Sequence, residues 1–213
     1  MATTDVTDTH PRGVRGEESF RQLTHVEMVY APGERALAAR VFELLGLRVV
    51  DHGGEWVFAL IDPEVADVAN NACYASEVTP EQWRLEQSLA SAMAEPEDHA
   101  AAPGTEVSQE VGAAARAYVD RVRGDPQHSF HFGIRYLERE DFEATLDRVR
   151  AAEADPELAG RVALLGVYDP SEPGALAPGM FQAFVRTDVV AGGLLTLGQL
   201  VELQWHLPKH APR

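Results

Sequence analysis

Histidine and carboxylate side chains occupy three strand-like runs of this sequence, where each shares a face with other polar groups. His25 opens HVEMVY, His131 opens HFGIRY, and Glu202 lies within GQLVELQW. Because successive side chains of a strand point to opposite faces, each run has one apolar face and one polar face. The apolar faces suit packing under helices. We therefore expect the three polar faces to line a site.

Other polar residues share these faces. Glu27 follows His25, Arg135 follows His131, and Gln204 follows Glu202, each at a spacing that keeps it on the polar side. Arg135 and Glu27 are candidates to orient an anionic or hydroxylated substrate, with Gln204 beside them. The alternative for Arg135 and Glu27 is a cross-strand ion pair, which is the more common role. Further along, Arg186 and Asp188 are expected to brace a turn.

The elements that position these faces form a repeated pattern. Residues 20–78 read as strand, helix and three strands, and residues 128–208 repeat that order with His opening and Tyr closing the first strand of each half. Between them, residues 79–127 predict a helical insert and linker that begins at Thr79 and Pro80. Residues 1–19 are expected to form a mobile lead-in and residues 209–213 a tail. The predicted fold is α+β, with two βαβββ units forming paired cupped sheets.

Composition narrows the class of protein. The chain has 213 residues, 45% of them hydrophobic, and a formal net charge of −16. Such an excess of carboxylates repels phosphate backbones and anionic lipids, so we expect neither nucleic acid nor membrane as a partner. A single cysteine, Cys73, excludes an intramolecular disulfide and a thiolate metal cage. No apolar leader is expected at the start, and the cytoplasm is the predicted location.

The two units, each opened by a histidine, and the closing strand Gly-x-x-x-Glu-Leu from Gly198 to Leu203 resemble the vicinal oxygen chelate superfamily. That superfamily includes glyoxalase I, extradiol dioxygenases and bleomycin-resistance proteins. The resemblance covers roughly residues 22–78 and 129–207, outside the lead-in and the insert. It implies two sheets that pair into a cup with a divalent metal at the bottom.

The resemblance implies the metal ligands His25, His131 and Glu202. Two imidazoles and a carboxylate suit Fe(II), Mn(II), Ni(II) or Zn(II) and leave positions open for substrate. The family often has a fourth ligand on the closing strand of the first unit, where Tyr74 and Glu77 have opposite strand parity. Glu77 is the chemically better candidate.

The implied function is a divalent-metal-dependent enzyme that acts on a small molecule with vicinal oxygens. The three-ligand set favours Fe(II) and dioxygenase-like, oxidoreductase chemistry, whereas Glu77 as a fourth ligand would favour a glyoxalase-like lyase or isomerase. A non-catalytic protein that sequesters a small ligand, as in bleomycin resistance, is the alternative from another class. A scaffold whose insert contacts a partner is a third possibility. The chain is expected to be a monomer or a homodimer.

Overall fold

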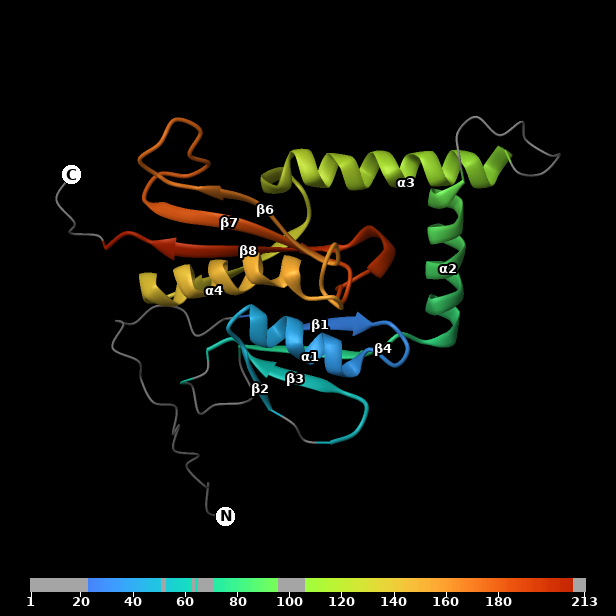
Figure 1. Ribbon diagram of the computed structural model, residues 1–213, viewed down its shortest axis with the longest axis horizontal. Helices are drawn as coiled ribbons and strands as arrows, with labels where there is room; N and C mark the ends of the chain where they lie inside the picture. Colours follow the sequence, from blue (N-terminus) through green and yellow to red (C-terminus); the bar gives the residue numbers. More distant parts are fainter. Residues whose placement is uncertain (1–22, 51–52, 63, 65–70, 96–105, 209–213) are drawn as a thin grey trace, which may run out of the picture.

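The computed structural model describes residues 23–50, 53–62, 64, 71–95 and 106–208. The predicted lead-in (1–19) and tail (209–213) lie outside the described residues. The first unit follows the predicted order (Figure 1). Its elements are β1 (His25–Tyr30), α1 (Arg35–Leu44), β2 (Arg48–Val50), β3 (Val57–Leu60) and β4 (Ala72–Glu77).

The second unit repeats this order after the insert. The insert consists of α2 (Pro80–Ala94), α3 (Glu106–Gly124) and the short helix η1 (Pro126–His128). The second unit contains β5 (His131–Tyr136), α4 (Arg139–Ala151), η2 (Ala152–Ala154), β6 (Val162–Tyr168), β7 (Met180–Thr187), η3 (Leu195–Leu197) and β8 (Gln199–His206). The α+β class and the two βαβββ units with a helical insert are confirmed.

Local sequence explains where the helices begin and end. In α1, Leu37, Val41 and Leu44 fall on one buried face, and Gly46, two residues past the helix, has a φ of 82° that favours glycine. At the start of α2, the hydroxyl of Thr79 accepts a hydrogen bond from the backbone N–H of Gln82 at 3.2 Å. Pro80 follows in the first turn, where its missing N–H costs nothing.

The described residues form two four-stranded sheets with matching topology. The first sheet has the order β1-β4-β3-β2 and the second β5-β8-β7-β6. In each sheet the opening strand runs parallel to the closing strand, and the other neighbours are antiparallel. The register sets Glu202 of β8 opposite Gly133 of β5 and Phe184 of β7.

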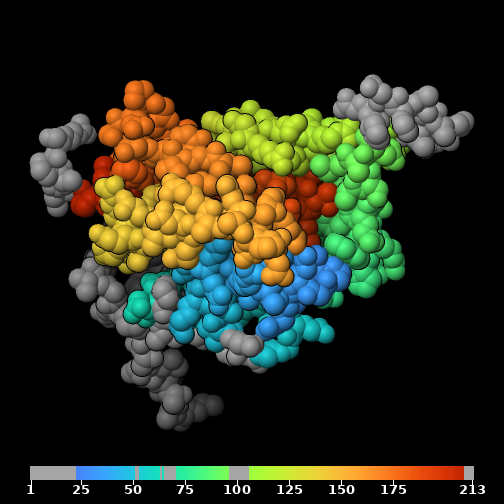
Figure 2. Space-filling model, in the orientation of Figure 1, coloured from blue at the N-terminus to red at the C-terminus, as the bar shows by residue number. Residues whose placement is uncertain are grey.

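One apolar core joins the two units. It contains Met28 and Tyr30 from the first sheet, Ile134 and Leu203 from the second, and the buried faces of α1 and α4. Figure 1 shows α1 and α4 lying between the two sheets, and Figure 2 shows α4 lying directly against the first unit. Since one face of each sheet is in this core, the faces that carry His25 and His131 point away from it, in opposite directions.

Polar contacts fix the two units against each other. The hydroxyl of Tyr136 donates to the carbonyl oxygen of Leu45 at 2.7 Å, and Nε of Arg148 donates to the carbonyl oxygen of Leu44 at 3.1 Å. These two carbonyls lie at the carboxyl end of α1, where the helix itself supplies no donor, and the second unit supplies one to each. Arg161 adds a bidentate ion pair to Glu34, at 2.7 and 2.9 Å.

The insert is anchored to the second unit through a buried carboxylate. Glu86 on α2 is 2% exposed. Its two carboxylate oxygens accept hydrogen bonds from the backbone N–H groups of Leu195 and Thr196, at 2.8 and 2.9 Å, and from the hydroxyl of Thr196 at 2.6 Å. Where α3 crosses α2, a Cβ on Gly112 would lie 2.1 Å from the carbonyl oxygen of Ala92, so only glycine permits this crossing. No helix in the described ranges is long and apolar enough to cross a membrane.

We expect Tyr136→Phe to weaken the contact between the units. The carbonyl of Leu45 loses its donor, which costs about 1 kcal/mol in the free energy of unfolding, measured in urea.

The pH dependence of stability gives a second readout for the same variant. Burial raises the pKa of Tyr136 from 10.0 to about 12. The unfolded chain therefore deprotonates first, and this group's contribution is present below pH 10 and lost as the pH rises towards 12. The variant should lose less stability over that interval, whereas Tyr118→Phe on the exposed side of α3 should match the wild type. Equal stability and equal alkaline slopes for Tyr136→Phe and the wild type would contradict the packing described.

We expect Glu86→Gln to detach the insert in part. The amide keeps one acceptor oxygen but loses the charge that strengthens three hydrogen bonds, so unfolding should become easier by about 1–3 kcal/mol. Glu81→Gln, at an exposed position in the first turn of the same helix, is the matched control. Chemical denaturation followed by tryptophan fluorescence reports the event, because Trp83 lies on α2. A loss no larger than that of the control would show that the carboxylate does not anchor the insert.

Candidate functional site

His131 and Glu202 meet on the outer face of the second sheet. Nε2 of His131 lies 3.2 Å from Oε2 of Glu202. The carboxylate side chain is 5% exposed and the imidazole 19% exposed, so the carboxylate is the deeper of the two and the imidazole borders solvent. The two strands are adjacent and parallel, which keeps the pair in place through the backbone ladder.

The hydrogen bond on the other side of the ring fixes the tautomer of His131. Nδ1 lies 2.8 Å from the carbonyl oxygen of Ser129, and because a carbonyl only accepts, Nδ1 carries the proton. In the neutral ring Nε2 then presents a lone pair to the Glu202 carboxylate, which is also an acceptor. Two acceptors at this distance require a proton or a cation between them. A ring held this way by a backbone carbonyl is the usual arrangement of a metal-binding histidine.

Gln182 of β7 completes the polar group on this face. Its amide nitrogen donates to Glu202, and to Oε1 of Gln127 in η1 at 3.2 Å. Its own Oε1 is buried and has no hydrogen-bond partner. Phe184 of β7, which lies opposite Glu202, packs its ring edge to face against the ring of His131, with centroids 5.4 Å apart. The face therefore offers a nitrogen, a carboxylate and an unpaired amide oxygen, which fit a divalent metal of intermediate hardness.

His25 lies on the outer face of the first sheet and is exposed. Its Nδ1 is 3.0 Å from the hydroxyl of Thr24, and its ring contacts Tyr74 edge to face, with centroids 5.7 Å apart. Tyr74 also packs on Phe58 and Trp56, so the surroundings of His25 are aromatic.

Glu77, the candidate fourth ligand, is on the other side of that sheet. Its Oε2 accepts a hydrogen bond from the backbone N–H of Gly33 at 2.9 Å, in the turn that leads into α1. Strand alternation puts Tyr74, rather than Glu77, on the face of His25. Glu77, the predicted fourth ligand, therefore does not share the face of His25, whereas Tyr74 does.

A single chain does not bring all the expected ligands together. Within the described residues, no group of three or more His, Cys, Asp or Glu side chains is placed to hold a metal. The physical reason is the shared core: both sheets turn their apolar faces to α1 and α4, so His25 is directed away from His131 and Glu202. The expectation of one three-ligand cluster per chain is corrected on this point.

The predicted substrate residues are divided in the same way. Gln204 and Arg135 lie on the outer face of the second sheet, and Oε1 of Gln204 is 3.3 Å from Nε2 of His206. Burial first, and then the charge of Arg135, lowers the pKa of His206. Glu27 lies on the first sheet, in a groove of about 640 Å³ against α2. No described ion pair joins Glu27 to Arg135.

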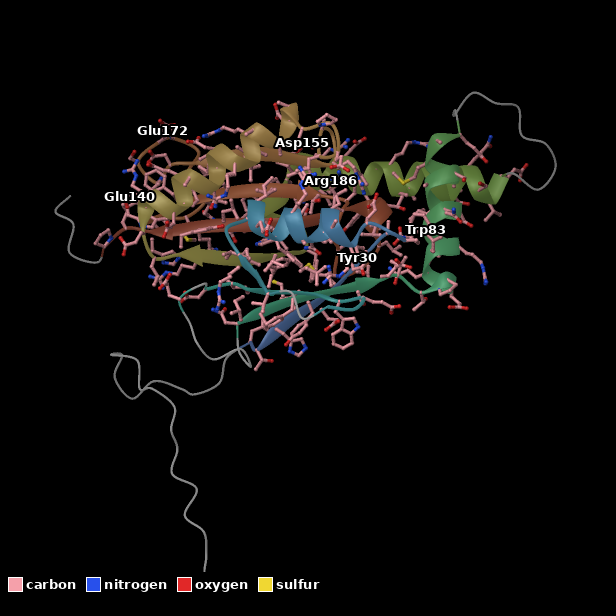
Figure 3. All side chains as sticks on the ribbon, turned by 60° about the horizontal axis from the view of Figure 1, so that its bottom comes forward. Tyr30, Trp83, Glu140, Asp155, Glu172 and Arg186 are labelled. Carbon is pink, nitrogen blue, oxygen red and sulfur yellow. The ribbon has the colours of Figure 1, made fainter. Side chains whose placement is uncertain are left out.

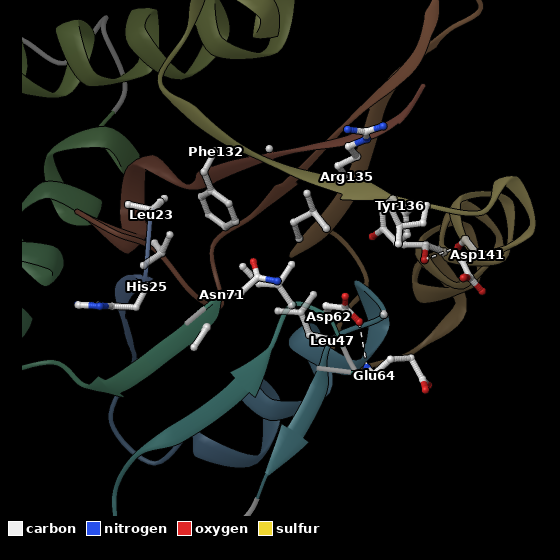
Figure 4. Close-up of a pocket in the computed structure, with 18 of the residues that line it drawn as sticks. Leu23, His25, Leu47, Asp62, Glu64, Asn71, Phe132, Arg135, Tyr136 and Asp141 are labelled. Carbon is white, nitrogen blue, oxygen red and sulfur yellow. Dashed lines mark hydrogen bonds between the residues drawn. The ribbon is translucent and has the colours of Figure 1, made fainter. Parts of the chain in front are cut away.

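A larger cavity of about 1150 Å³ lies where the two units meet, between the start of β1 and the middle and end of β5 (Figure 4). His25, Asn71, Phe132 and Arg135 are among the residues that line it. Neither His131 nor Glu202 does. The histidine–carboxylate pair therefore does not contribute to the wall of this cavity.

Two residues of β7 differ from the sequence prediction. Gln182 is not among the predicted site residues, and Arg186 is predicted to brace a turn with Asp188. The turn is instead braced by Arg161, whose Nε lies 2.8 Å from Asp188 and whose hydrogen bonds to Glu34 and Asp188 raise its pKa. Strand alternation in MFQAFVRT places Gln182, Phe184 and Arg186 on one face, and that signal was available in the sequence.

The topology of the two units identifies the fold. Each unit pairs its first strand in parallel with its fourth and places the third and second strands beyond, and the two units follow each other in one chain. The chain has the vicinal oxygen chelate fold. This duplicated arrangement carries a histidine at the start of each unit and a glutamate on the last strand, as the sequence resemblance implied.

Solved structures with the vicinal oxygen chelate fold are similar to this chain at low identity. Oxidase ChaP-H2 is 13% identical with a TM-score of 0.37, covering 91% of this chain and 98% of its own. A glyoxylase/bleomycin resistance protein/dioxygenase domain from Frankia sp. EAN1pec is 10% identical with a TM-score of 0.41, covering 88% and 99%. The fosfomycin resistance protein FosX from Listeria monocytogenes is 11% identical with a TM-score of 0.35, covering 92% and 97%.

No protein-family model and no curated protein matches the chain.

Proposed function

We propose that the protein is a divalent-metal-dependent enzyme of the vicinal oxygen chelate type that acts on a small molecule with vicinal oxygens. The observation that carries this proposal is the His131–Glu202 pair, in which Nε2 of an imidazole oriented by the Ser129 carbonyl faces a buried carboxylate. A metal cation could bind between these two side chains. Among the described residues, no lysine or arginine forms an ion pair with Glu202. The single buried cysteine fits a reducing compartment, and we place the enzyme in the cytoplasm.

His131 and Glu202 would hold the metal, which when bound acts as a Lewis acid towards substrate oxygens and, as Fe(II), allows chemistry with O₂. The Ser129 carbonyl orients the imidazole, and the Gln182 amide holds one carboxylate oxygen. We favour Fe(II) and dioxygenase-like chemistry over a glyoxalase-like lyase with Zn(II), Ni(II) or Mn(II). The reason is that Glu77, which would supply a fourth protein ligand, is engaged in the turn before α1.

A third ligand has two candidate sources. One is Oε1 of Gln182, buried and unpaired beside Glu202 in the same chain. The other is His25 of a second copy, because a homodimer that sets the first sheet of one copy beside the second sheet of the other would bring an exposed imidazole to the pair. We favour His25, since imidazole is the stronger ligand for these metals and its ring is already exposed.

We expect His131→Ala and Glu202→Gln to lose the bound metal. Elemental analysis after anaerobic purification should find about one metal ion per chain in the wild type and little in either variant, because each variant loses one of the two proposed metal ligands. Glu77→Gln is the matched control, since it removes a carboxylate from the other face of a sheet, and it should keep its metal. A wild type that is metal-free yet binds small molecules would favour the sequestering alternative and contradict the enzyme.

We expect His25→Ala to lose metal in its own homodimer and to regain it in mixed dimers. When His25→Ala and His131→Ala chains are unfolded together and refolded, random pairing leaves about a quarter of the sites with every ligand intact. The metal content of the mixture should recover to about a quarter of the wild-type content, although neither variant binds metal alone. Full metal in His25→Ala by itself would instead assign the third ligand to Gln182, and no recovery on mixing would exclude a site shared between copies.

A further inference from the structure

Arg186 carries a buried positive charge without a described partner. The residue is 7% exposed, and its Nε is buried without a hydrogen-bond partner. Within the described ranges no carboxylate forms an ion pair with it, whereas Arg161, also in the second unit, is held by two, Glu34 and Asp188. Figure 3 labels Arg186 within the body of the molecule, away from the surface positions Glu140 and Glu172.

The surroundings accommodate this charge without neutralising it. A Cβ on Gly198 would lie 2.7 Å from Nη2 of Arg186, so the guanidinium packs against backbone where a side chain would otherwise stand. Burial lowers the pKa of Arg186, the charge of Asp188 opposes this, and Arg123 on α3 lowers it further. An unpaired buried guanidinium costs stability, so a protein that keeps one has a use for it in another state.

The position of Arg186 connects it to the proposed metal ligands. In the register of the sheet, Arg186 lies opposite Leu200, and Leu200 lies opposite His131. All three point to the outer face, in one row across β7, β8 and β5. With neighbouring strands about 4.8 Å apart, the Cα atoms of Arg186 and His131 are separated by about 10 Å.

A second unpaired atom lies on the same strand and face. Gln182 Oε1 is a buried acceptor, and Arg186 Nε is a buried donor four residues further on, with Phe184 between them. Unsatisfied buried polar atoms are rare in folded proteins, and two on one face beside a histidine–carboxylate pair point to a missing ligand. The ligand must be anionic where it meets Arg186 and must bear a hydrogen-bond donor where it meets Gln182.

We propose that Arg186 recognises the substrate's acidic group, so that the substrate is a small organic acid whose carboxylate pairs with Arg186 while its vicinal oxygens reach His131 and Glu202. This rests on the proposed function, because it assigns a substrate class to the same site. The span of about two strand spacings matches an acid with one ring or a chain of similar length between the two groups. A planar carboxylate forms a bidentate pair with a guanidinium, which a phenol or an amide does not.

The first test is the stability of two matched variants without metal or ligand. We expect Arg186→Met to raise the melting temperature by about 2–4 °C, because it removes an unpaired buried charge. Arg161→Met should lower the melting temperature, because it leaves two carboxylates without their partner. A decrease for Arg186→Met as large as that for Arg161→Met would show that Arg186 is a structural residue and would overturn the proposal.

The second test measures recognition of a carboxylate directly. 3,4-Dihydroxybenzoate and 3,4-dihydroxybenzamide differ in charge but hardly in shape, and each has a ring between its vicinal oxygens and its carboxylate or amide. Both are titrated into protein with a chelator present. We expect the benzoate to bind about ten-fold more tightly than the benzamide to the wild type, the two to bind equally to Arg186→Met, and Arg186→Lys to keep part of the preference. Equal binding of both compounds to the wild type would overturn the assignment. Because the chelator removes metal from these titrations, loss of the carboxylate preference is separate from a failure of metal binding, which the elemental analysis reports.

Discussion

The shared apolar core on α1 and α4 is the constraint on which the rest of the structure depends. Each sheet of this fold has one face for a helix and one face for chemistry. Burial of apolar side chains provides about 25 cal/mol per Å², and packing both helix faces together buries more of that surface than either unit can alone. The consequence is that the two polar faces point outward, so that His25 is separated from His131 and Glu202 in one chain.

The two half-sites have different character. Around His25 the side chains are aromatic and the imidazole is exposed. Around His131 the side chains are polar and deeply buried: Glu202 is 4% exposed and Gln182 is 1% exposed. A buried carboxylate next to the imidazole Nε2 is unfavourable unless a proton or a metal cation joins them. Under the proposed function the second sheet would hold the metal, and His25 on the first sheet would serve as a ligand for a second copy.

Much of the fold was predictable from the sequence because the signals are local. Alternation within HVEMVY and HFGIRY assigns each side chain to a face, and Thr79 followed by Pro80 marks the start of α2. His131 and Glu202 met because they lie on strands that must be neighbours in a unit of this topology. How the two units pack on each other is not a local signal. An apolar face shows that it will be buried, but it does not identify the surface that buries it, and so the position of His25 could not be predicted.

Arg186 shows the same limit for a charged residue. The sequence predicts that Arg186 and Asp188 brace a turn, but Asp188 is held instead by Arg161, the residue before β6. Strand parity places Arg186 on the polar face of β7. A charge that folding leaves unpaired is visible only when every competing partner has been placed.

Paramagnetic relaxation by Mn²⁺ tests most directly whether the outer face of the second sheet is the cation site. In a ¹⁵N-labelled sample titrated with Mn²⁺, the account predicts that the backbone amide signals of Gly133, Phe184 and Glu202 broaden first, because these residues surround the histidine–carboxylate pair. The same titration of His131→Ala should leave them sharp. Broadening centred on the insert or on the cavity between the units, with the signals of Phe184 and Glu202 unaffected, would contradict the account.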